Sequence, residues 1–235
     1  MPDPESARTR ALDALARWII AIDRPHPLRV AIDGRTAAGK TTLADELVAP
    51  LERHHRPVIR IQIDDFHHPA AVRHRRQELP PWQRYYRDSY NHPAIRDTLL
   101  ALGAGGGRCY CRALFDSYHD VPIIEPERVA SPDAIVLVDG VFLFRPELDD
   151  LWDVRLFVEI DADESLRRGP PRDQAWVGSV EAAAQRYRTT YIPAEDYYIE
   201  TVRPCERADV VVDNRDPAVP ALWFRHPSGS AEEEP

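Results

Sequence analysis

Short apolar runs alternate with segments of helical periodicity along much of the chain. Over residues 7–22, Leu12, Leu15, Ile19 and Ile22 recur at helical spacing until RPHP ends the run, which predicts an amphipathic helix. Apolar runs at five further places are typical of buried strands: 28–33, 58–64, 134–140, 154–161 and 208–213. This alternation predicts an α/β fold with a five-stranded parallel sheet and helices packed on it.

Each of the predicted strands ends in Asp, or in Asp followed by Gly. In an open parallel sheet, ligands bind outside the carboxyl ends of the strands, so these acidic residues are expected to converge on one crevice. The alternative is that each Asp only stops a strand or caps a helix.

The segment between the second and third predicted strands is rich in Arg, aromatic residues, His and Pro. We expect this insert, residues 67–130, to carry its own short helix and strands and to cover a substrate, because it is too long for a plain crossover. Residues 1–225 are expected to form a single domain. The end of the chain, residues 226–235, has the composition of a disordered tail.

Charge and composition narrow the class of partner. The chain has 235 residues, of which 43% are hydrophobic and 29% charged, and its formal net charge is -9. This charge argues against nucleic-acid binding, which needs an excess of Lys and Arg, and favours a small-molecule partner. No apolar run is long enough for a membrane span or a signal peptide, so we expect a cytoplasmic protein that binds no membrane.

The sequence GRTAAGKTT, residues 34–42, directly follows the first predicted strand and fits the phosphate-binding loop G-x-x-x-x-G-K-[ST]. Glycine allows the tight turn that brings backbone N–H groups to the phosphates, and the next helix directs its positive end at them. Lys40 is expected to bind the β and γ phosphates and Thr41 to ligate Mg²⁺. The nucleotide-binding residues are therefore predicted to be Gly34, Arg35, Thr36, Ala37, Ala38, Gly39, Lys40, Thr41 and Thr42.

Two further strand ends carry candidate carboxylates. Asp139 ends AIVLVDG and could hold Mg²⁺ directly or through water, although an apolar strand ending in Asp-Gly is also a common structural feature. Asp64 and Asp65 end the second strand, which we expect to lie next to the phosphate loop. Either could accept the proton of an attacking hydroxyl, and a helix cap with a solvated neighbour is the structural alternative.

The ordered set GRTAAGKTT, DDF, SYNHP, FDSYH, VLVDG and DADESLRRGPPRD, over about residues 28–215, resembles the uridine kinase and phosphoribulokinase family. The resemblance implies a P-loop NTPase fold of three layers, with a lid over the nucleotide. It implies ATP as phosphoryl donor, with Mg²⁺, and a hydroxyl as acceptor, the 5′-hydroxyl if the acceptor is a nucleoside.

The same resemblance assigns roles on the acceptor side. Asp64 matches the family's catalytic Asp, while Asp65 and His67 stand where Ser and Tyr are usual. Asn91 replaces the Asp that grips the ribose hydroxyls, and an Asn still bonds a hydroxyl but brings no charge. The stretch FDSYH resembles the family segment that holds the pyrimidine ring, which makes Phe115 and His119 candidates for binding it. For His119, an ordinary surface histidine is the alternative.

The predicted lid, residues 163–195, departs from the family. Members carry several Arg on a helix here, and this chain offers Arg167, Arg168 and Arg172. The sequence Gly-Pro-Pro at 169–171 is expected to break the helix between them. We expect Arg168 and Arg172 to close over the transferring phosphoryl group, with surface arginines as the alternative. Asn214, after the last strand, is a candidate for the adenine site.

Three questions stay open at this level. Within the kinases, the acceptor could instead be pantothenate, a sugar or a sugar phosphate. The alternative outside the kinases is a nucleotide-binding switch or a regulatory ATPase, which would have no small-molecule acceptor. The Arg, His and Tyr side chains of residues 73–92 either contact an acceptor or form a polar surface, and a homo-oligomer is compatible with the sequence.

Overall fold

The central sheet of the computed structural model, which describes residues 4–225, has six strands in the order β10-β9-β8-β1-β7-β2. Five of them are parallel: β1 (Leu28–Gly34), β2 (Val58–Gln62), β7 (Ile135–Asp139), β8 (Val154–Glu159) and β9 (Val210–Asp213). The predicted five-stranded parallel sheet is therefore confirmed. The predicted tail, 226–235, lies outside the described residues.

A sixth strand, β10 (Ala221–Phe224), pairs antiparallel with β9 at the edge of the sheet. It was not predicted, because its four residues are mostly exposed and show no buried face. The pairing covers the edge of β9 that would otherwise be open.

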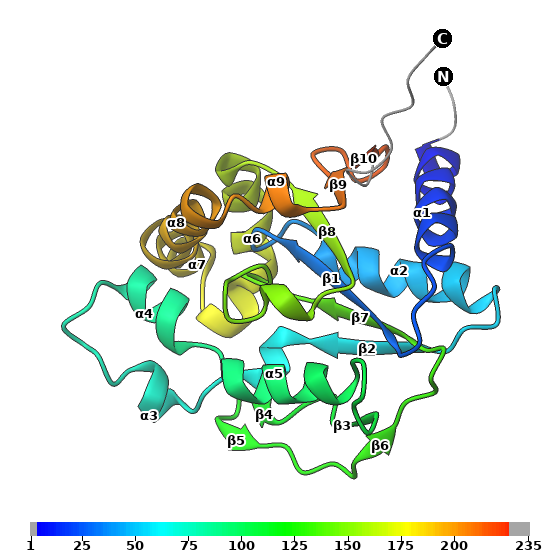
Figure 1. Ribbon diagram of the computed structural model, residues 1–235. Coiled ribbons are helices and arrows are strands. Elements are labelled where there is room, and N and C mark those ends of the chain that lie inside the picture. The colour runs from blue at the N-terminus through cyan, green and yellow to red at the C-terminus, as the bar shows by residue number, and fades with distance from the viewer. Residues whose placement is uncertain (1–3, 226–235) are drawn as a thin grey trace.

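Helices cover both faces of the sheet, which gives three layers (Figure 1). On one face, α1 (Pro4–Ile20) and α2 (Lys40–Glu52) pack through Leu15 and Leu47 onto Val30 and Ile32 of β1. On the other, α5 (His92–Ala101), α8 (Ile192–Val202) and α9 (Pro204–Arg207) pack against the alternate strand residues, such as Ala31. Because both faces are covered, the strands read as continuous apolar runs.

The insert between β2 and β7 carries short elements, as its length suggested. It begins with the 3₁₀ turn η1 (Ile63–Phe66) and continues with α3 (Ala70–Arg73), α4 (Pro81–Asp88) and α5. Two small antiparallel pairs follow: β3 (Cys109–Tyr110) with β6 (Arg128–Val129), and β4 (Phe115–Asp116) with β5 (Val121–Pro122). A second 3₁₀ turn, η2 (Asp149–Leu151), precedes β8.

The predicted break at Gly-Pro-Pro does not occur: α6 (Ala162–Val177) runs through Pro170 and Pro171 without interruption. Proline removes a backbone N–H donor and crowds the carbonyl of residue i−4, and it also crowds the Cβ of the residue before it, a contact that Gly169 avoids for Pro170 but not for Pro171. A Cβ at Gly169 would also lie 1.9 Å from Cζ of Tyr187. Gly169 thus lets Tyr187 pack directly on the helix.

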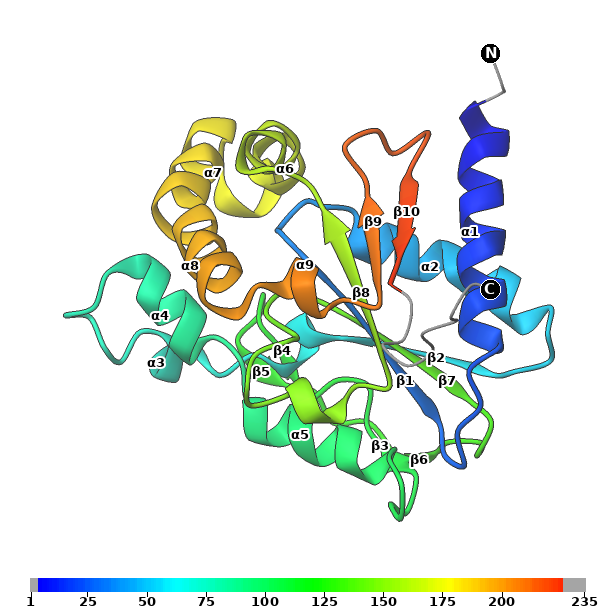
Figure 2. The ribbon, with the colours of Figure 1, turned by 45° about the horizontal axis from the view of Figure 1, so that its top comes forward.

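The predicted lid region then turns back through α7 (Val180–Arg186) and a π-helical turn, η3 (Tyr187–Tyr191), into α8. Helices α6, α7 and α8 lie on the same side of the molecule as α3 and α4 (Figures 1 and 2). The two groups make aromatic contacts, since Tyr85 of α4 lies 5.0 Å from Tyr191 between ring centroids. Insert and lid therefore meet near the carboxyl ends of the strands.

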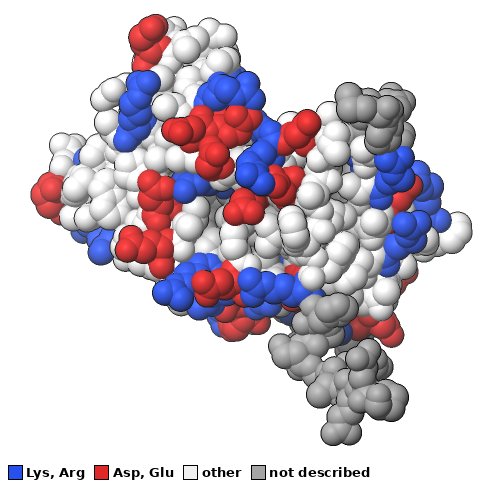
Figure 3. Space-filling model, turned by 90° about the horizontal axis from the view of Figure 1, so that it is seen from above, with Lys and Arg blue, Asp and Glu red and all other residues white. Residues whose placement is uncertain are grey.

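Among residues 4–225, no helix has both the length and the apolar character needed to cross a bilayer. Seen from above, the molecule carries acidic and basic side chains close to one another, without a large area of one sign on that face (Figure 3).

Candidate active site

The phosphate loop follows β1 and ends where α2 begins at Lys40. Both of its glycines are required by close approaches. A Cβ at Gly34 would lie 2.4 Å from the carbonyl oxygen of Val158. Gly39 has φ of +91°, and a Cβ there would lie 2.7 Å from Nδ2 of Asn214. Helix α2 begins at Lys40 directly after Gly39, so its N-terminal N–H groups lie at the end of the loop, where they can bind an anion.

Lys40 is buried beneath the loop, and its Nζ donates a hydrogen bond to the carbonyl oxygen of Arg35, 2.7 Å away. Burial lowers the pKa of Lys40, while Glu195, Asp33 and Asp139 oppose this by their negative charge. The ammonium group is thus held among carboxylates at the place where the nucleotide phosphates are expected.

Thr41 and Asp139, the two expected Mg²⁺ ligands, lie against each other. The Thr41 hydroxyl donates to Oδ2 of Asp139 at 2.5 Å. The other carboxylate oxygen, Oδ1, forms an ion pair with Arg60 at 2.9 Å but accepts no hydrogen bond. Residues 4–225 contain no cluster of three or more His, Cys, Asp or Glu that could hold a metal. The pair still fits Mg²⁺, which is commonly bound by one or two protein oxygens together with substrate phosphates and water.

Asp64 lies in η1, after the end of β2, and not on the strand next to the phosphate loop as expected. Strand β7 lies between β1 and β2 in the sheet. The turn of η1 nevertheless brings Asp64 to the wall of a cavity of about 460 Å³ that Lys40, Thr41 and Asp139 also line. The Asp64 carboxylate is 68% exposed and accepts a hydrogen bond from the Tyr90 hydroxyl at 3.0 Å. It is therefore both accessible and oriented.

Asp65 does not line this cavity. It is half-buried, and burial, with the charges of Asp64, Asp139 and neighbouring acids, raises its pKa to about 6. Of the two candidate bases, the geometry favours Asp64.

The residues expected to hold an acceptor are only partly brought together. His67 lines the cavity, donates from Nδ1 to the Asp64 carbonyl oxygen at 2.7 Å, and has its pKa lowered by burial. Asn91 is the N-cap of α5, where its side chain accepts from Ala94 N–H at 3.2 Å. Phe115 is buried in β4, and His119 pairs through Nδ1 with Asp116 at 2.6 Å.

None of Asn91, Phe115 and His119 lines the cavity, in contrast to the expectation. The stretch FDSYH reaches the wall through Ser117 and Tyr118 instead. The alternation of β4 turns the Phe115 ring into the core, and the turn after it leaves His119 beside its own Asp116.

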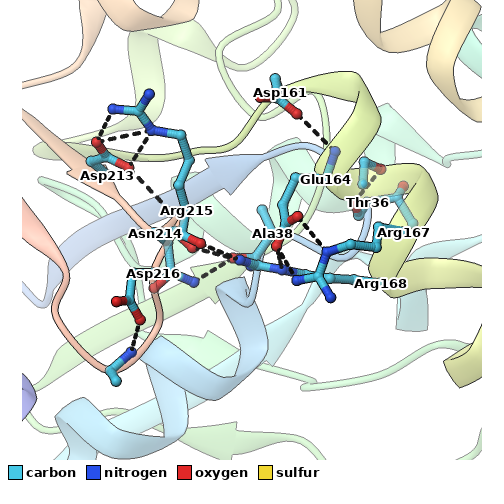
Figure 4. Close-up of polar contacts among 12 residues, drawn as sticks. Thr36, Ala38, Asp161, Glu164, Arg167, Arg168, Asp213, Asn214, Arg215 and Asp216 are labelled. Atoms are coloured by element: carbon cyan, nitrogen blue, oxygen red, sulfur yellow. Dashed lines mark hydrogen bonds and ion pairs between the residues drawn. The ribbon is translucent and has the colours of Figure 1, made fainter. Parts of the chain in front are cut away.

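The arginines expected in the lid divide into two groups. Arg172 lines the cavity, pairs with Asp173 at 2.7 Å and lies 3.4 Å from the Tyr187 hydroxyl. Arg168 does not line the cavity and instead donates to the backbone oxygens of Asn214 and Arg215, at 2.9 and 3.0 Å (Figure 4). Arg167 is exposed and pairs with Glu164.

Asn214 is buried, and its Nδ2 donates to the Ala38 carbonyl oxygen at 2.6 Å (Figure 4). It therefore holds the phosphate loop to the segment after β9. Because its Nδ2 donates to the loop, the Asn214 side chain has fewer hydrogen-bonding groups free for adenine than the sequence suggested.

Two buried carboxylates lie near the loop, of which Glu195 was missed from the sequence and Asp33 was included only as one of the strand-end acids. Glu195 of α8 accepts from the Thr36 N–H at 2.7 Å and lies 3.6 Å from Arg35, and burial raises its pKa. Asp33 accepts from the N–H groups of Gly34 and Leu143, at 2.7 and 3.0 Å, and from the Tyr198 hydroxyl. Burial raises the pKa of Asp33 to about 6. Nothing in the local sequence around Glu195 indicates that α8 lies against the loop.

Two uridine-cytidine kinases of Dictyostelium discoideum are similar to the chain in sequence. Kinase B is 28% identical over 193 residues, which cover 80% of this chain and 74% of that protein. Kinase A is 26% identical over 188 residues, which cover 80% of this chain but only 36% of that protein. The chain thus matches little more than a third of the length of kinase A.

A solved structure described as a possible uridine kinase from Bacillus stearothermophilus is similar in fold. Its TM-score is 0.68, over 86% of this chain and 97% of the other, at 24% identity. No family model matches the sequence. The chain therefore has the fold of the P-loop kinases, and the resemblance to uridine kinases that its motifs indicated is confirmed by relatives of that name.

Proposed function

We propose that the protein is a Mg²⁺- and ATP-dependent kinase that transfers the γ-phosphoryl group to a hydroxyl of a small molecule. The observation that carries this proposal is one cavity lined by Lys40 and Thr41 of the phosphate loop and by the carboxylates Asp64 and Asp139. Phosphoryl transfer needs a phosphate cradle, a metal site and a base for the attacking hydroxyl, and this cavity has a candidate for each.

On the nucleotide side, the backbone of residues 34–42 and the Lys40 ammonium bind the phosphates. Thr41 and Asp139 hold the Mg²⁺, which neutralises charge on the phosphates when bound. Asn214 and Arg168 act on this side as positioning residues, because both bind backbone of the loop or of the segment packed on it.

On the acceptor side, Asp64 accepts the proton of the attacking hydroxyl while the hydroxyl oxygen forms its bond to the γ phosphorus. The bond between that phosphorus and the β–γ bridging oxygen breaks, and ADP leaves. Tyr90 keeps the carboxylate in place through its hydrogen bond. Arg172, at the cavity wall, binds the oxygens of the transferring group, and residues 163–195 act as the lid.

Uridine and cytidine are the first acceptors to examine, because the names of the relatives specify them. The positions of Asn91, Phe115 and His119 outside the cavity do not favour them over a sugar, a sugar phosphate or pantothenate.

The proposal is tested by measuring ADP formation with ATP, Mg²⁺ and a panel of alcohols, for the wild type and for Asp64→Asn. A kinase forms ADP only with an acceptor and loses this activity in the variant. ATP turnover that is independent of any acceptor and unchanged in Asp64→Asn would instead identify a nucleotide-binding switch or regulatory ATPase.

A further inference from the structure

A second cavity opens beside the catalytic one, between α3–α4 and α7–η3. Its volume is about 430 Å³, and its lining includes Arg73, His74, Arg84 and Arg186 but no Asp or Glu. Arg73 and Arg186 line the catalytic cavity as well, together with Tyr85 and Ser89. The two cavities therefore share a wall, and this second one, which we term the basic cavity, has only positive charge.

The two shared arginines have donors that the protein leaves uncommitted. Among the described residues, 4–225, Arg186 has no carboxylate partner; its guanidinium lies 4.8 and 5.4 Å from the ring centroids of Trp176 and Tyr191 and hydrogen-bonds the Tyr191 hydroxyl, which leaves its other N–H groups for a ligand. A guanidinium stacked on a ring still presents its N–H groups at the edge, in the fork geometry that binds carboxylate or phosphate.

Arg73 differs in having protein partners. One of its terminal nitrogens lies 3.3 Å from Asp120 and 3.5 Å from the Ser117 carbonyl oxygen, but its Nε is buried without a hydrogen-bond acceptor. A buried donor without a partner costs free energy, so a ligand that supplied an acceptor would stabilise this side chain. Arg73 and Arg186 also act on the catalytic cavity, because their charges add to burial in lowering the pKa of His67.

We propose that the acceptor is an anion: while its hydroxyl lies at Asp64, a phosphate or carboxylate group at its other end is bound by Arg73 and Arg186 in the basic cavity. This inference rests on the proposed kinase function. A neutral nucleoside would leave Arg186 without a carboxylate or phosphate partner and Nε of Arg73 without an acceptor.

The test compares acceptors that differ only in the anionic group: uridine with uridine 3′-monophosphate, pantothenol with pantothenate, and fructose with fructose 6-phosphate. We expect the anionic member of at least one pair to have a kcat/KM about 100-fold higher, as for two charge-assisted hydrogen bonds. The phosphate and carboxylate pairs distinguish the two kinds of anion.

The variants Arg73→Gln and Arg186→Gln are each expected to raise KM for the anionic acceptor by about 10-fold or more and to change kcat little. Arg75→Gln and Arg188→Gln are matched controls, because these arginines lie two residues away and line neither cavity. A purely structural role would change kcat, KM and the melting temperature together, and would affect neutral and anionic acceptors alike.

Equilibrium binding of the same six compounds, and of inorganic phosphate and acetate, is measured by calorimetry with a non-hydrolysable ATP analogue and Mg²⁺ filling the phosphate loop. Anion binding that needs Arg73 and Arg186, without turnover of any acceptor, would support the basic cavity and overturn the kinase proposal. Turnover of neutral alcohols that is unchanged in both variants would support the kinase proposal and overturn the anion site. The absence of both anion binding and turnover would overturn both proposals.

Discussion

The nucleotide side and the acceptor side of the cavity are built in different ways. The nucleotide side comes from one continuous segment, residues 34–42, whose shape depends on close approaches at Gly34 and Gly39. The acceptor side is assembled from several separate segments, among them those of Asp64, Tyr90, Tyr118, Arg172 and Arg186. A site made by one segment can be recognised from local sequence, whereas one made by several depends on how the segments pack.

The largest expected effect is on the nucleotide side. Lys40→Ala is expected to lower kcat by about 1,000-fold, as the loss of one preorganised charge at a developing anion does. The measurement is ADP formation at saturating acceptor. A variant that keeps wild-type kcat would contradict the assignment of residues 34–42 to phosphate binding.

Lys40 is the only lysine in the sequence, which gives a second measurement at the same place. An amine-directed reagent should modify the chain internally only at Lys40, and ATP with Mg²⁺ should protect it. Mass spectrometry of the peptides reads the result, and modification that ATP leaves unchanged would count against phosphate binding by this side chain.

On the acceptor side, Asp64→Asn is expected to lower kcat by about 100- to 10,000-fold, the usual contribution of a general base, with ATP affinity unchanged. Asp65→Asn is the matched control, since Asp65 does not line the cavity. A larger loss in Asp65→Asn than in Asp64→Asn would reverse the assignment of the base.

The two lid arginines are expected to differ in which kinetic constant their replacement changes. Arg172→Gln is expected to lower kcat by about 10- to 100-fold through lost contact with the transferring group. Arg168→Gln should mainly raise KM for ATP, because Arg168 binds the backbone after β9. Steady-state kinetics with varied ATP separate the two, and equal effects on kcat would show that both arginines face the phosphoryl group.

The smallest effect concerns the packing of the lid. Gly169→Ala places a Cβ against the Tyr187 ring and is expected to lower the free energy of unfolding by about 1–3 kcal/mol. Gly107→Ala is the control, because no atom lies within 4 Å of its added Cβ. Chemical denaturation measures both variants, and equal stabilities would mean that α6 and Tyr187 are not in direct contact.

The sequence was sufficient for the parallel strands because each is a run of residues buried on both faces. It was insufficient for β10, whose residues are exposed, and for α6, which continues through Pro170 and Pro171 with Tyr187 packed against Gly169. The phosphate loop was recognisable from spacing alone.

Positions on the acceptor side and in the lid were harder to predict, because a motif residue can be engaged in a structural contact instead. Asn91 caps a helix and Arg168 binds backbone carbonyls, whereas Arg186 lines the cavity only because η3 folds back beside α4. These outcomes depend on contacts between segments that are distant in the chain.

The central claim is that nucleotide and acceptor meet at Asp64. Its most direct test is ADP formation by the wild type with ATP and Mg²⁺, with and without each alcohol of the acceptor panel, followed by mass spectrometry of the acceptor. The account predicts that ADP forms only with an alcohol and that the alcohol gains one phosphoryl group. ATP hydrolysis at the same rate with every alcohol and with none, and no phosphorylated alcohol, would contradict it.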